Sequence, residues 1–237
     1  MPVFELTKDC LFPDPTLSEP DGLLAYGGDL SVKRLLAAYS EGIFPWFSDE
    51  DPILWWSPDP RMVLFPQEFV RHKSLRTLIN KGKFQVTFDT VFEQVIRKCA
   101  EVERYDLENG TWITEEMVRA YKRLHRAGYA HSVETWFEGE LVGGLYGISL
   151  GGMFFGESMF HTMTDASKVA LWHLVELLIA WDFDLIDAQQ DTNHLRNMGG
   201  KLIRRKDFLH LLVQSTAKSS RIGNWSRGID GKPRVNA

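Results

Sequence analysis

The chain has 237 residues, of which 44% are hydrophobic, 25% are charged and 12% are aromatic, and its formal net charge is -5. This composition is typical of a globular protein with one large and one small domain, and the lack of a run of about 20 apolar residues or of a signal peptide predicts a cytoplasmic protein without a membrane span. The acidic balance argues against general nucleic-acid coating but allows a local basic patch, and the two cysteines exclude a disulfide framework and a multi-cysteine zinc site.

Residues 1–62 are expected to form a small N-terminal domain. Ser31 is a good N-cap for a helix that Gly42 ends, because serine accepts a backbone hydrogen bond at a helix start and glycine favours the turn after a helix. The buried stripe of this predicted helix consists of Leu35, Leu36 and Tyr39.

An aromatic, proline-rich segment over residues 52–61 ends this domain. It contains too many prolines for a central strand and too many aromatic residues for an ordinary loop. Either the segment packs the small domain onto the rest of the chain, which is the commoner use of aromatic residues, or one tryptophan stacks a planar ligand such as a base. The candidates for stacking are Trp55 and Trp56 of this segment and Trp46 of the preceding residues 42–47.

A larger domain is expected over residues 63–216, and its first half reads as helical. A basic run from Arg71 to Lys83 is either a solvated helix face or a surface for phosphate contacts. A strand near Thr87 leads to a helix that Asp89 is expected to cap, and Thr114 should cap a second helix. Trp112, just before the second helix, either anchors the core or contacts a ligand.

From His131 the hydrophobic pattern changes to a period of two, which predicts a three-stranded antiparallel meander. The expected strands cover residues 131–137, 140–150 and 153–160, with glycine-containing turns between them. Strict alternation places Glu157 on the same face as Met153, Phe155 and Met159. A carboxylate among such side chains is costly unless it is paired, so Glu157 indicates a polar site with an apolar floor.

The second half of the domain adds a buried helix from Ala166 to about Trp181, which Asp165 should cap, and a strand over residues 185–189. Asp187 and Gln189 share one face of that strand, so a second carboxylate lies where a core residue is expected. A short helical piece, a strand near Leu202 and a last helix follow. Residues 217–237 are expected to form a loosely held tail.

This element order predicts an α+β fold with a mixed sheet. It also describes the core of the acyltransferase superfamily that includes the N-acetyltransferases, although an architecture alone assigns no reaction.

Many segments of the chain resemble the leucyl/phenylalanyl-tRNA–protein transferase family, in the same order and with similar gaps. They include Gly42-Ile-Phe-Pro-Trp-Phe47 and Phe155-Gly-Glu-Ser-Met-Phe160, and the others are residues 19–25, 27–31, 53–61, 110–113, 130–134, 141–147, 166–168 and 185–187. The resemblance implies an enzyme that transfers Leu or Phe, and also Met, from aminoacyl-tRNA to the N-terminal Arg or Lys of a protein and so marks that protein for degradation.

The resemblance also implies roles for individual residues. Gln189 would contact the attacking amine, Asp187 would orient Gln189, and Glu157 would complete the polar wall and hold the cationic end of the acceptor. The aminoacyl side chain would enter an apolar pocket of Leu145, Phe154, Met159, Leu171 and Ile186. Strict alternation places Met159 on the face of Glu157, but it does not place Phe154 with Glu157 or Ile186 with Asp187, so a bulge or a more distant role has to be invoked.

The terminal adenosine of the tRNA would stack on Trp46 and Trp112. The tRNA backbone would meet Arg71, Lys73, Arg76, Lys81 and Lys83. The chain departs from the family pattern at Ala188, where cysteine is common, and within residues 71–75 and 195–200.

Two other functions remain open at this point: a CoA-dependent N-acetyltransferase and a non-catalytic tRNA-binding protein. Residues 196–200 are only a broken version of the glycine-rich loop that would hold a CoA pyrophosphate. The aminoacyl ester is already activated, so the reaction needs no metal and no cofactor, and the seven histidines show no ligand spacing. We expect a monomer.

Overall fold

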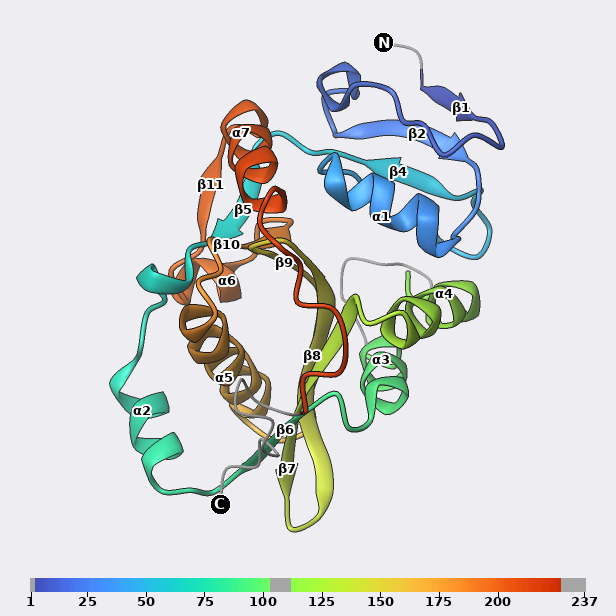
Figure 1. The fold of residues 1–237 in the computed structure, drawn as a ribbon. Helices are drawn as coiled ribbons and strands as arrows, with labels where there is room; N and C mark the ends of the chain where they lie inside the picture. The colour runs from blue at the N-terminus through green and yellow to red at the C-terminus, as the bar shows by residue number, and fades with distance from the viewer. Residues whose placement is uncertain (1–2, 103–111, 227–237) are drawn as a thin grey trace.

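The computed structural model describes residues 3–102 and 112–226, and the strands of this part form two sheets (Figure 1). The small sheet has the spatial order β1 (Phe4–Leu6), β2 (Leu23–Gly27), β4 (Leu54–Trp56) and β3 (Phe44–Pro45). Helix α1 (Val32–Ser40) begins as predicted, because the Ser31 hydroxyl accepts a hydrogen bond from the Arg34 amide, and Gly42 follows its end with a φ of 74°.

Part of the proline-rich segment is a central strand of the small sheet, so our prediction for residues 52–61 was wrong. β4 pairs with β2 on one side and with β3 on the other. The prolines of the segment lie before and after the three residues of β4. Because they lie outside the strand, they remove no hydrogen bond from its interior.

The large sheet is mixed and carries the predicted meander at its centre. Its spatial order is β11 (Lys201–Ile203), β5 (Arg61–Leu64), β10 (Leu185–Gln189), β9 (Met153–His161), β8 (Glu140–Leu150), β7 (Ala130–Phe137) and β6 (Gln85–Phe88). Neighbouring strands are antiparallel except β9 and β10, which are parallel. The fold is therefore α+β, as predicted from the element order.

Glycines let β8, the middle strand of the meander, lie close to its neighbours. A Cβ atom on Gly147 would lie 2.2 Å from the carbonyl oxygen of Phe155 on β9. A Cβ atom on Gly143 would lie 2.5 Å from the side chain of Ala166 at the start of α5 (Ala166–Ala180). Only glycine fits at such approaches, as the glycines in this predicted strand indicated.

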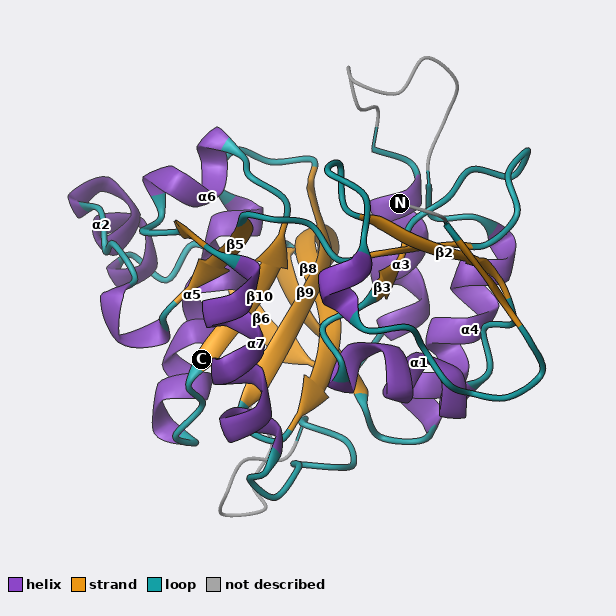
Figure 2. Cartoon of the chain, turned by 90° about the horizontal axis from the view of Figure 1, so that it is seen from above, coloured by secondary structure: helices purple, strands orange, loops and turns teal. Residues whose placement is uncertain are grey.

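Helices cover both faces of the large sheet (Figure 2). One face carries α5 and α2 (Lys73–Asn80), and the other carries α3 (Phe92–Ala100) and α4 (Glu115–Arg126). The buried apolar residues divide in the same way, with Phe154 in the cluster that includes α5 and Phe155 in the cluster that includes α1, α3 and α4. The remaining elements are the 3-10 helices η1 (Pro15–Leu17) and η2 (Pro66–Glu68) and the α-helices α6 (Asn193–Asn197) and α7 (Arg205–Thr216).

Of the predicted caps, Thr114 acts as expected, since its hydroxyl accepts from the Met117 amide at 3.2 Å. Asp165 occupies the N-cap position of α5, but its carboxylate pairs with Lys168 at 2.7 Å instead of capping the backbone. Asp89 does not cap α3, which begins at Phe92. Asp89 lies two residues before the N-cap position, which Val91 occupies, and has a left-handed backbone with a φ of 55°.

The carboxylate of Asp89 instead holds the end of the described chain, which corrects the prediction of a loose tail after residue 216. It accepts hydrogen bonds from His131 and from the backbone amides of Ser132 and Trp225. The Trp225 side chain is 3% exposed and its ring stacks on that of His131 with 3.6 Å between centroids. Trp225 therefore anchors an otherwise largely exposed segment to the protein, and residues 227–237 of the predicted tail lie outside the described residues.

Candidate active site

The two parallel strands β9 and β10 pair over only three residues and then separate. The pairs are Leu185 with Met153, Ile186 with Phe154 and Asp187 with Phe155. Beyond them each strand has a bulge, with Glu157 as the extra residue of β9 opposite β8 and Ala188 as the extra residue of β10 opposite β5. Bulges redirect side chains and break strand pairing, so two of them side by side open the sheet at this point.

The bulge at Glu157 overturns the predicted alternation along β9. Met153 and Phe155 belong to the cluster that includes α1, α3 and α4, but Met159 packs on the cluster that includes α5. Phe154 lies in that same α5 cluster, so Phe154 and Met159 share a face although their spacing is odd. A bulge changes the face of every later residue in its strand, which explains how the pocket residues come together.

A cavity of about 830 Å³ lies where β9 and β10 separate. It is lined by Glu157 and Gln189, by both tryptophans predicted to stack a base, and by all five residues of the predicted apolar pocket: Trp46, Trp112, Leu145, Phe154, Met159, Leu171 and Ile186. Residues from five distant parts of the sequence thus meet at one place. The cavity has a polar wall, an apolar floor and aromatic side chains, the usual combination for a small-molecule site.

Glu157 forms the centre of the polar wall. Its Oε1 accepts hydrogen bonds from the hydroxyl of Tyr39 at 2.8 Å and from the amide nitrogen of Gln189 at 2.9 Å. Its Oε2 accepts one from the hydroxyl of Tyr121 at 2.9 Å. Burial outweighs these hydrogen bonds and raises the pKa of Glu157 to about 7. The carboxyl group can therefore gain or lose a proton at neutral pH.

Asp187 lies behind the cavity and does not line it. It is fully buried, and its two carboxylate oxygens accept hydrogen bonds from Nε and Nη2 of Arg61 at 2.8 and 2.7 Å. The Arg61 guanidinium lies between the rings of Phe44 and Phe208, 4.8 and 4.7 Å from their centroids. This bidentate, aromatic-flanked pair neutralises the buried carboxylate.

The Asp187 side chain contacts the backbone of Gln189 and not its side chain. Asp187 Oδ1 accepts a hydrogen bond from the backbone amide of Gln189 at 3.0 Å. Gln189 has a left-handed φ of 60°, which is uncommon for a residue with a side chain. Asp187 therefore fixes the unusual backbone of Gln189, and Glu157 fixes the Gln189 side chain.

The four tryptophans considered as ligand contacts have different environments. Trp55 is fully buried and packs edge-on against Phe12, so it is a core residue. Trp56 lines a second hollow and donates its ring N–H to the carbonyl oxygen of Trp46. Trp46 and Trp112 are each half-buried at the large cavity.

The five basic residues predicted to meet the tRNA backbone lie on and around α2, away from the cavity lining. Arg71 pairs with Glu176 of α5 at 2.6 Å and lies over the ring of Trp172. The other four are exposed: Lys73, Arg76, Lys81 and Lys83.

Three residues of this site were missed at the sequence level: Arg61, Tyr39 and Tyr121. Tyr39 was predicted to lie in the buried stripe of its helix, Arg61 was the last residue of the aromatic, proline-rich segment, and no role at the site was predicted for Tyr121. A signal did exist, because a buried carboxylate requires a cation and a buried tyrosine requires a hydrogen-bond partner. That signal shows that the buried groups need partners, but it does not show which residues those partners are.

Two general properties complete the description of the site. Within residues 3–102 and 112–226, no three His, Cys, Asp or Glu side chains lie close enough to hold a metal ion together. Nor is any helix in this part of the chain both long enough and apolar enough to cross a membrane.

Comparison with known proteins gives consistent matches along the chain. Residues 63–213 match the model of the family described as leucyl/phenylalanyl-tRNA protein transferase, and residues 28–59 match the model of that family's N-terminal domain. The chain is 58% identical to the leucyl/phenylalanyl-tRNA–protein transferase of Syntrophobacter fumaroxidans over 95% of this chain and 96% of that protein. It is 54% identical to the enzyme of the same name from Legionella pneumophila (strain Paris) over 92% and 97%.

Solved structures give weaker matches. L-PGS from Bacillus licheniformis has a TM-score of 0.36 at 12% identity, covering 69% of this chain and 50% of that one. The aminoglycoside acetyltransferase meta-AAC0020, from a soil metagenomic sample and in complex with sisomicin, also has a TM-score of 0.36 at 12% identity, covering 60% and 95%.

Proposed function

Because the chain belongs to the leucyl/phenylalanyl-tRNA–protein transferase family and is therefore an aminoacyltransferase, we propose that the cavity between β9 and β10 is where the aminoacyl ester meets the acceptor amine. The observation that carries this proposal is the meeting of three kinds of surface in one cavity: the Gln189 and Glu157 wall, the apolar floor and the two tryptophans. Transfer needs an amine aligned with an ester that is already activated. A positioned amide and a titrating carboxyl group suit that task.

Gln189 is proposed to contact the attacking amine. Its side-chain nitrogen donates to Glu157 and no described residue donates to its side-chain oxygen, so that oxygen can accept a hydrogen bond from the amine. A neutral amide is a poor base, so Gln189 positions the amine and leaves the proton to another group. Asp187 acts indirectly, because its carboxylate holds the backbone of Gln189.

The apolar floor is proposed to hold the side chain of Leu, Phe or Met. Leu145, Phe154 and Leu171 face the cavity from β8, β9 and α5, and each of these residues is nearly fully buried. Straight or Cγ-branched apolar side chains gain free energy by leaving water for such a surface. A charged or short polar side chain gains none.

Stacking on the two tryptophans should contribute strongly to tRNA binding. We expect Trp46→Ala and Trp112→Ala each to weaken binding of aminoacyl-tRNA by about 1–3 kcal/mol, because each removes one face for the terminal base. Trp136→Ala is the matched control, since Trp136 is also half-buried but does not line the cavity. Fluorescence titration measures the affinity of each variant for aminoacyl-tRNA. An equal loss of affinity in all three variants would contradict the stacking role.

The acceptor is proposed to begin with Arg or Lys. A second hollow of about 190 Å³ shares Phe44, Trp46 and Gln189 with the large cavity, and Asp21 and Asp191 line it. Its position beside Gln189 and its carboxylates suit a cationic side chain whose α-amine enters the large cavity. Asp191 also pairs with Arg196, which leaves Asp21 as the less neutralised of the two.

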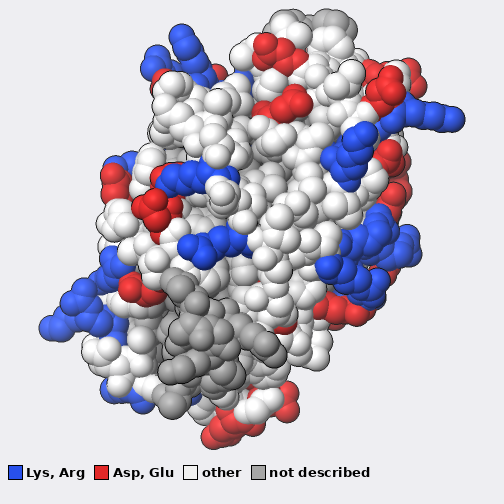
Figure 3. Space-filling view, viewed as in Figure 1, with Lys and Arg blue, Asp and Glu red and all other residues white. Residues whose placement is uncertain are grey.

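The basic residues around α2 are proposed to contact the tRNA backbone beyond its terminal nucleotide. Figure 3 shows that charges of both signs are interspersed on this face, with basic side chains gathered toward α2 and toward α4. The net charge is negative, so phosphate contacts have to be local. The proposal further places a monomeric enzyme in the cytoplasm, where aminoacyl-tRNA is available.

A transfer assay tests the function directly. Purified protein, [³H]Leu-tRNA and peptides that differ only in their first residue should give labelled product with Arg or Lys in first place and none with Asp. Binding of Leu-tRNA without transfer to any peptide would instead indicate a tRNA-binding protein. A thermal shift with acetyl-CoA but not with aminoacyl-tRNA would indicate an N-acetyltransferase.

A further inference from the structure

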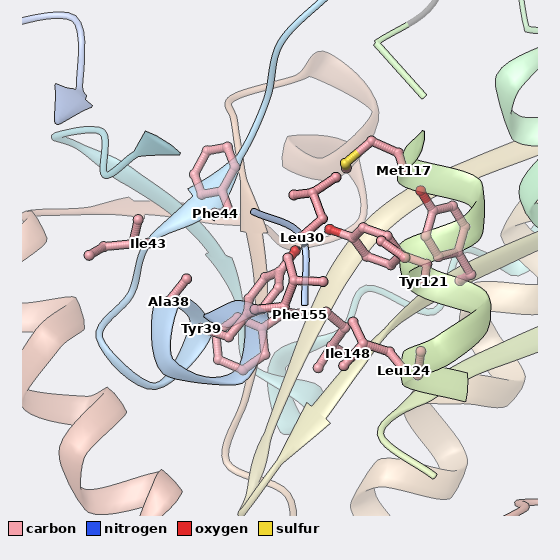
Figure 4. Packing of buried hydrophobic residues seen from close by; sticks show 14 of the residues in the cluster. Leu30, Ala38, Tyr39, Ile43, Phe44, Met117, Tyr121, Leu124, Ile148 and Phe155 are labelled. Atoms are coloured by element: carbon pink, nitrogen blue, oxygen red, sulfur yellow. Dashed lines mark hydrogen bonds between the residues drawn. The ribbon is translucent and has the colours of Figure 1, made fainter. Parts of the chain in front are cut away.

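Three oxygen-bearing side chains from distant elements form a closed ring beside the cavity. Tyr39 of α1 and Tyr121 of α4 reach β9 from the same side, next to Phe155 (Figure 4). The Tyr39 hydroxyl lies 2.8 Å from Glu157 Oε1, the Tyr121 hydroxyl 2.9 Å from Glu157 Oε2, and the two hydroxyls 2.5 Å from each other. All three groups thus contact one another.

The number of hydrogens in this ring depends on the charge of Glu157. Each of the three contacts needs one hydrogen, and the two phenols supply two. If Glu157 is ionised, one contact has no hydrogen and two oxygen lone pairs face each other. If Glu157 is protonated, three hydrogens serve three contacts, so the geometry fits the ring with an added proton.

Burial supports the same conclusion. Both tyrosines are fully buried and Glu157 is 9% exposed, so water does not readily replace a missing partner. Burial, with the Glu157 charge second, raises the pKa of each phenol well above its ordinary value, so neither tyrosine ionises at neutral pH. Glu157 is therefore the member of the ring that changes its charge.

We propose that Tyr39, Tyr121 and Glu157 form a proton-holding ring that takes the proton released by the attacking amine and returns it to the leaving ribose oxygen. This inference rests on the proposed function of the cavity. The uncharged amine forms the N–C bond and loses one proton to the Glu157 carboxylate. The ester C–O bond then breaks with its electron pair, and the ribose oxygen takes that proton, so the ring returns to its starting state.

Other charged and titratable groups lie around the ring. Asp187 of β10 opposes ionisation of Glu157, although Arg61 of β5 neutralises much of that charge, and the Tyr146 phenol of β8 lies near both tyrosines. Across the cavity the lining includes His161 of β9, Lys168 of α5 and His194 of α6. Lys168 pairs with Asp165, and burial lowers the pKa of His194. None of these groups is a member of the three-way contact.

The test compares conservative variants by two readouts. Glu157→Gln keeps the shape and supplies amide hydrogens to the ring but cannot accept a proton, so we expect single-turnover transfer from bound Leu-tRNA to fall by about 10²-fold with tRNA affinity unchanged. In Tyr39→Phe/Tyr121→Phe the hydrogen bonds that lower the pKa of Glu157 are lost, so the pH midpoint of transfer should move upward. Tyr129→Phe, half-buried outside the cavity, should behave as the wild type.

A direct titration separates this inference from the proposed function. In protein labelled with [¹³Cδ]Glu, the signal absent from Glu157→Gln should titrate near pH 7 in the wild type and at higher pH in the double phenylalanine variant. A midpoint at the ordinary value of a glutamate, or one that the tyrosine substitutions do not move, would overturn the ring. Tyr39→Phe alone gives the same readout if the double variant does not fold. Failure of the wild type to transfer would count against the cavity's function and leave this titration unaffected.

Discussion

Replacing Asp187 with alanine is expected to lower the free energy of unfolding by about 3–5 kcal/mol, because the substitution leaves the guanidinium of Arg61 buried without its partner. Asp187 is fully buried and Arg61 is 1% exposed, so water cannot replace the lost carboxylate. Arg61 Nη1 already has no hydrogen-bond partner within the described residues, which adds to the cost of losing the other two bonds. Urea denaturation of the variant and the wild type measures the difference.

Two further variants show whether the loss comes from an unpaired charge. Asp191→Ala removes an exposed carboxylate that pairs with Arg196, and it should cost no more than about 1 kcal/mol. Arg61→Met/Asp187→Leu removes both buried charges, and it should recover much of the stability lost in the single variant. A single variant as stable as the wild type would show that Asp187 and Arg61 are not paired in the folded protein.

Replacing Gln189 with alanine is expected to lower the single-turnover rate of transfer by about 10²–10³-fold, in line with the loss of one positioned polar group at a reacting centre. Gln189 lines the cavity and is 8% exposed, whereas the adenosine and the aminoacyl side chain would rest on other residues. The affinity for Leu-tRNA should therefore stay close to that of the wild type. Rapid-quench transfer and filter binding on the same preparation separate the two effects.

Gln214→Ala is the control for this variant, because Gln214 lies exposed on α7, where its side-chain amide contacts His210. It should leave both the rate and the affinity unchanged. Equal losses of rate and affinity in Gln189→Ala would mean that Gln189 binds substrate without aligning the amine.

The elements that local signals specify were predicted well. The turns at Glu138-Gly139 and Gly151-Gly152 and a period of two define the meander, and Ser31 and Thr114 cap their helices as expected. Each of these signals lies within a few residues of the structure that it specifies. Short-range physical chemistry is therefore sufficient for most of the α+β framework.

Features that depend on distant partners were not predicted. β5 is a strand because it pairs with β10 and β11, which follow more than 120 residues later in the chain. Asp89 looked like a helix cap because its partners, His131 and Trp225, are remote in sequence. No local pattern distinguishes such a residue from an ordinary cap.

The candidate site contains features of both kinds, some that local sequence predicts and some that depend on distant partners. The positions of Glu157 and Asp187 in otherwise apolar strands marked the site, because buried carboxylates are costly. The bulge in β9 that brings Phe154, Met159 and Glu157 to one cavity did not follow from a period of two. Bulges depend on the register between strands, which a single strand's sequence does not contain.

The most direct test of the cavity's role is the binding of 3′-leucylamido-adenosine, an unreactive analogue of the aminoacyl end of the tRNA. Leu171→Trp fills the apolar floor from α5, and Val213→Trp places the same side chain on the exposed surface of α7. We predict that calorimetry detects binding to the wild type and to Val213→Trp and little or none to a folded Leu171→Trp. Equal affinity in all three proteins would show that the aminoacyl end binds somewhere else.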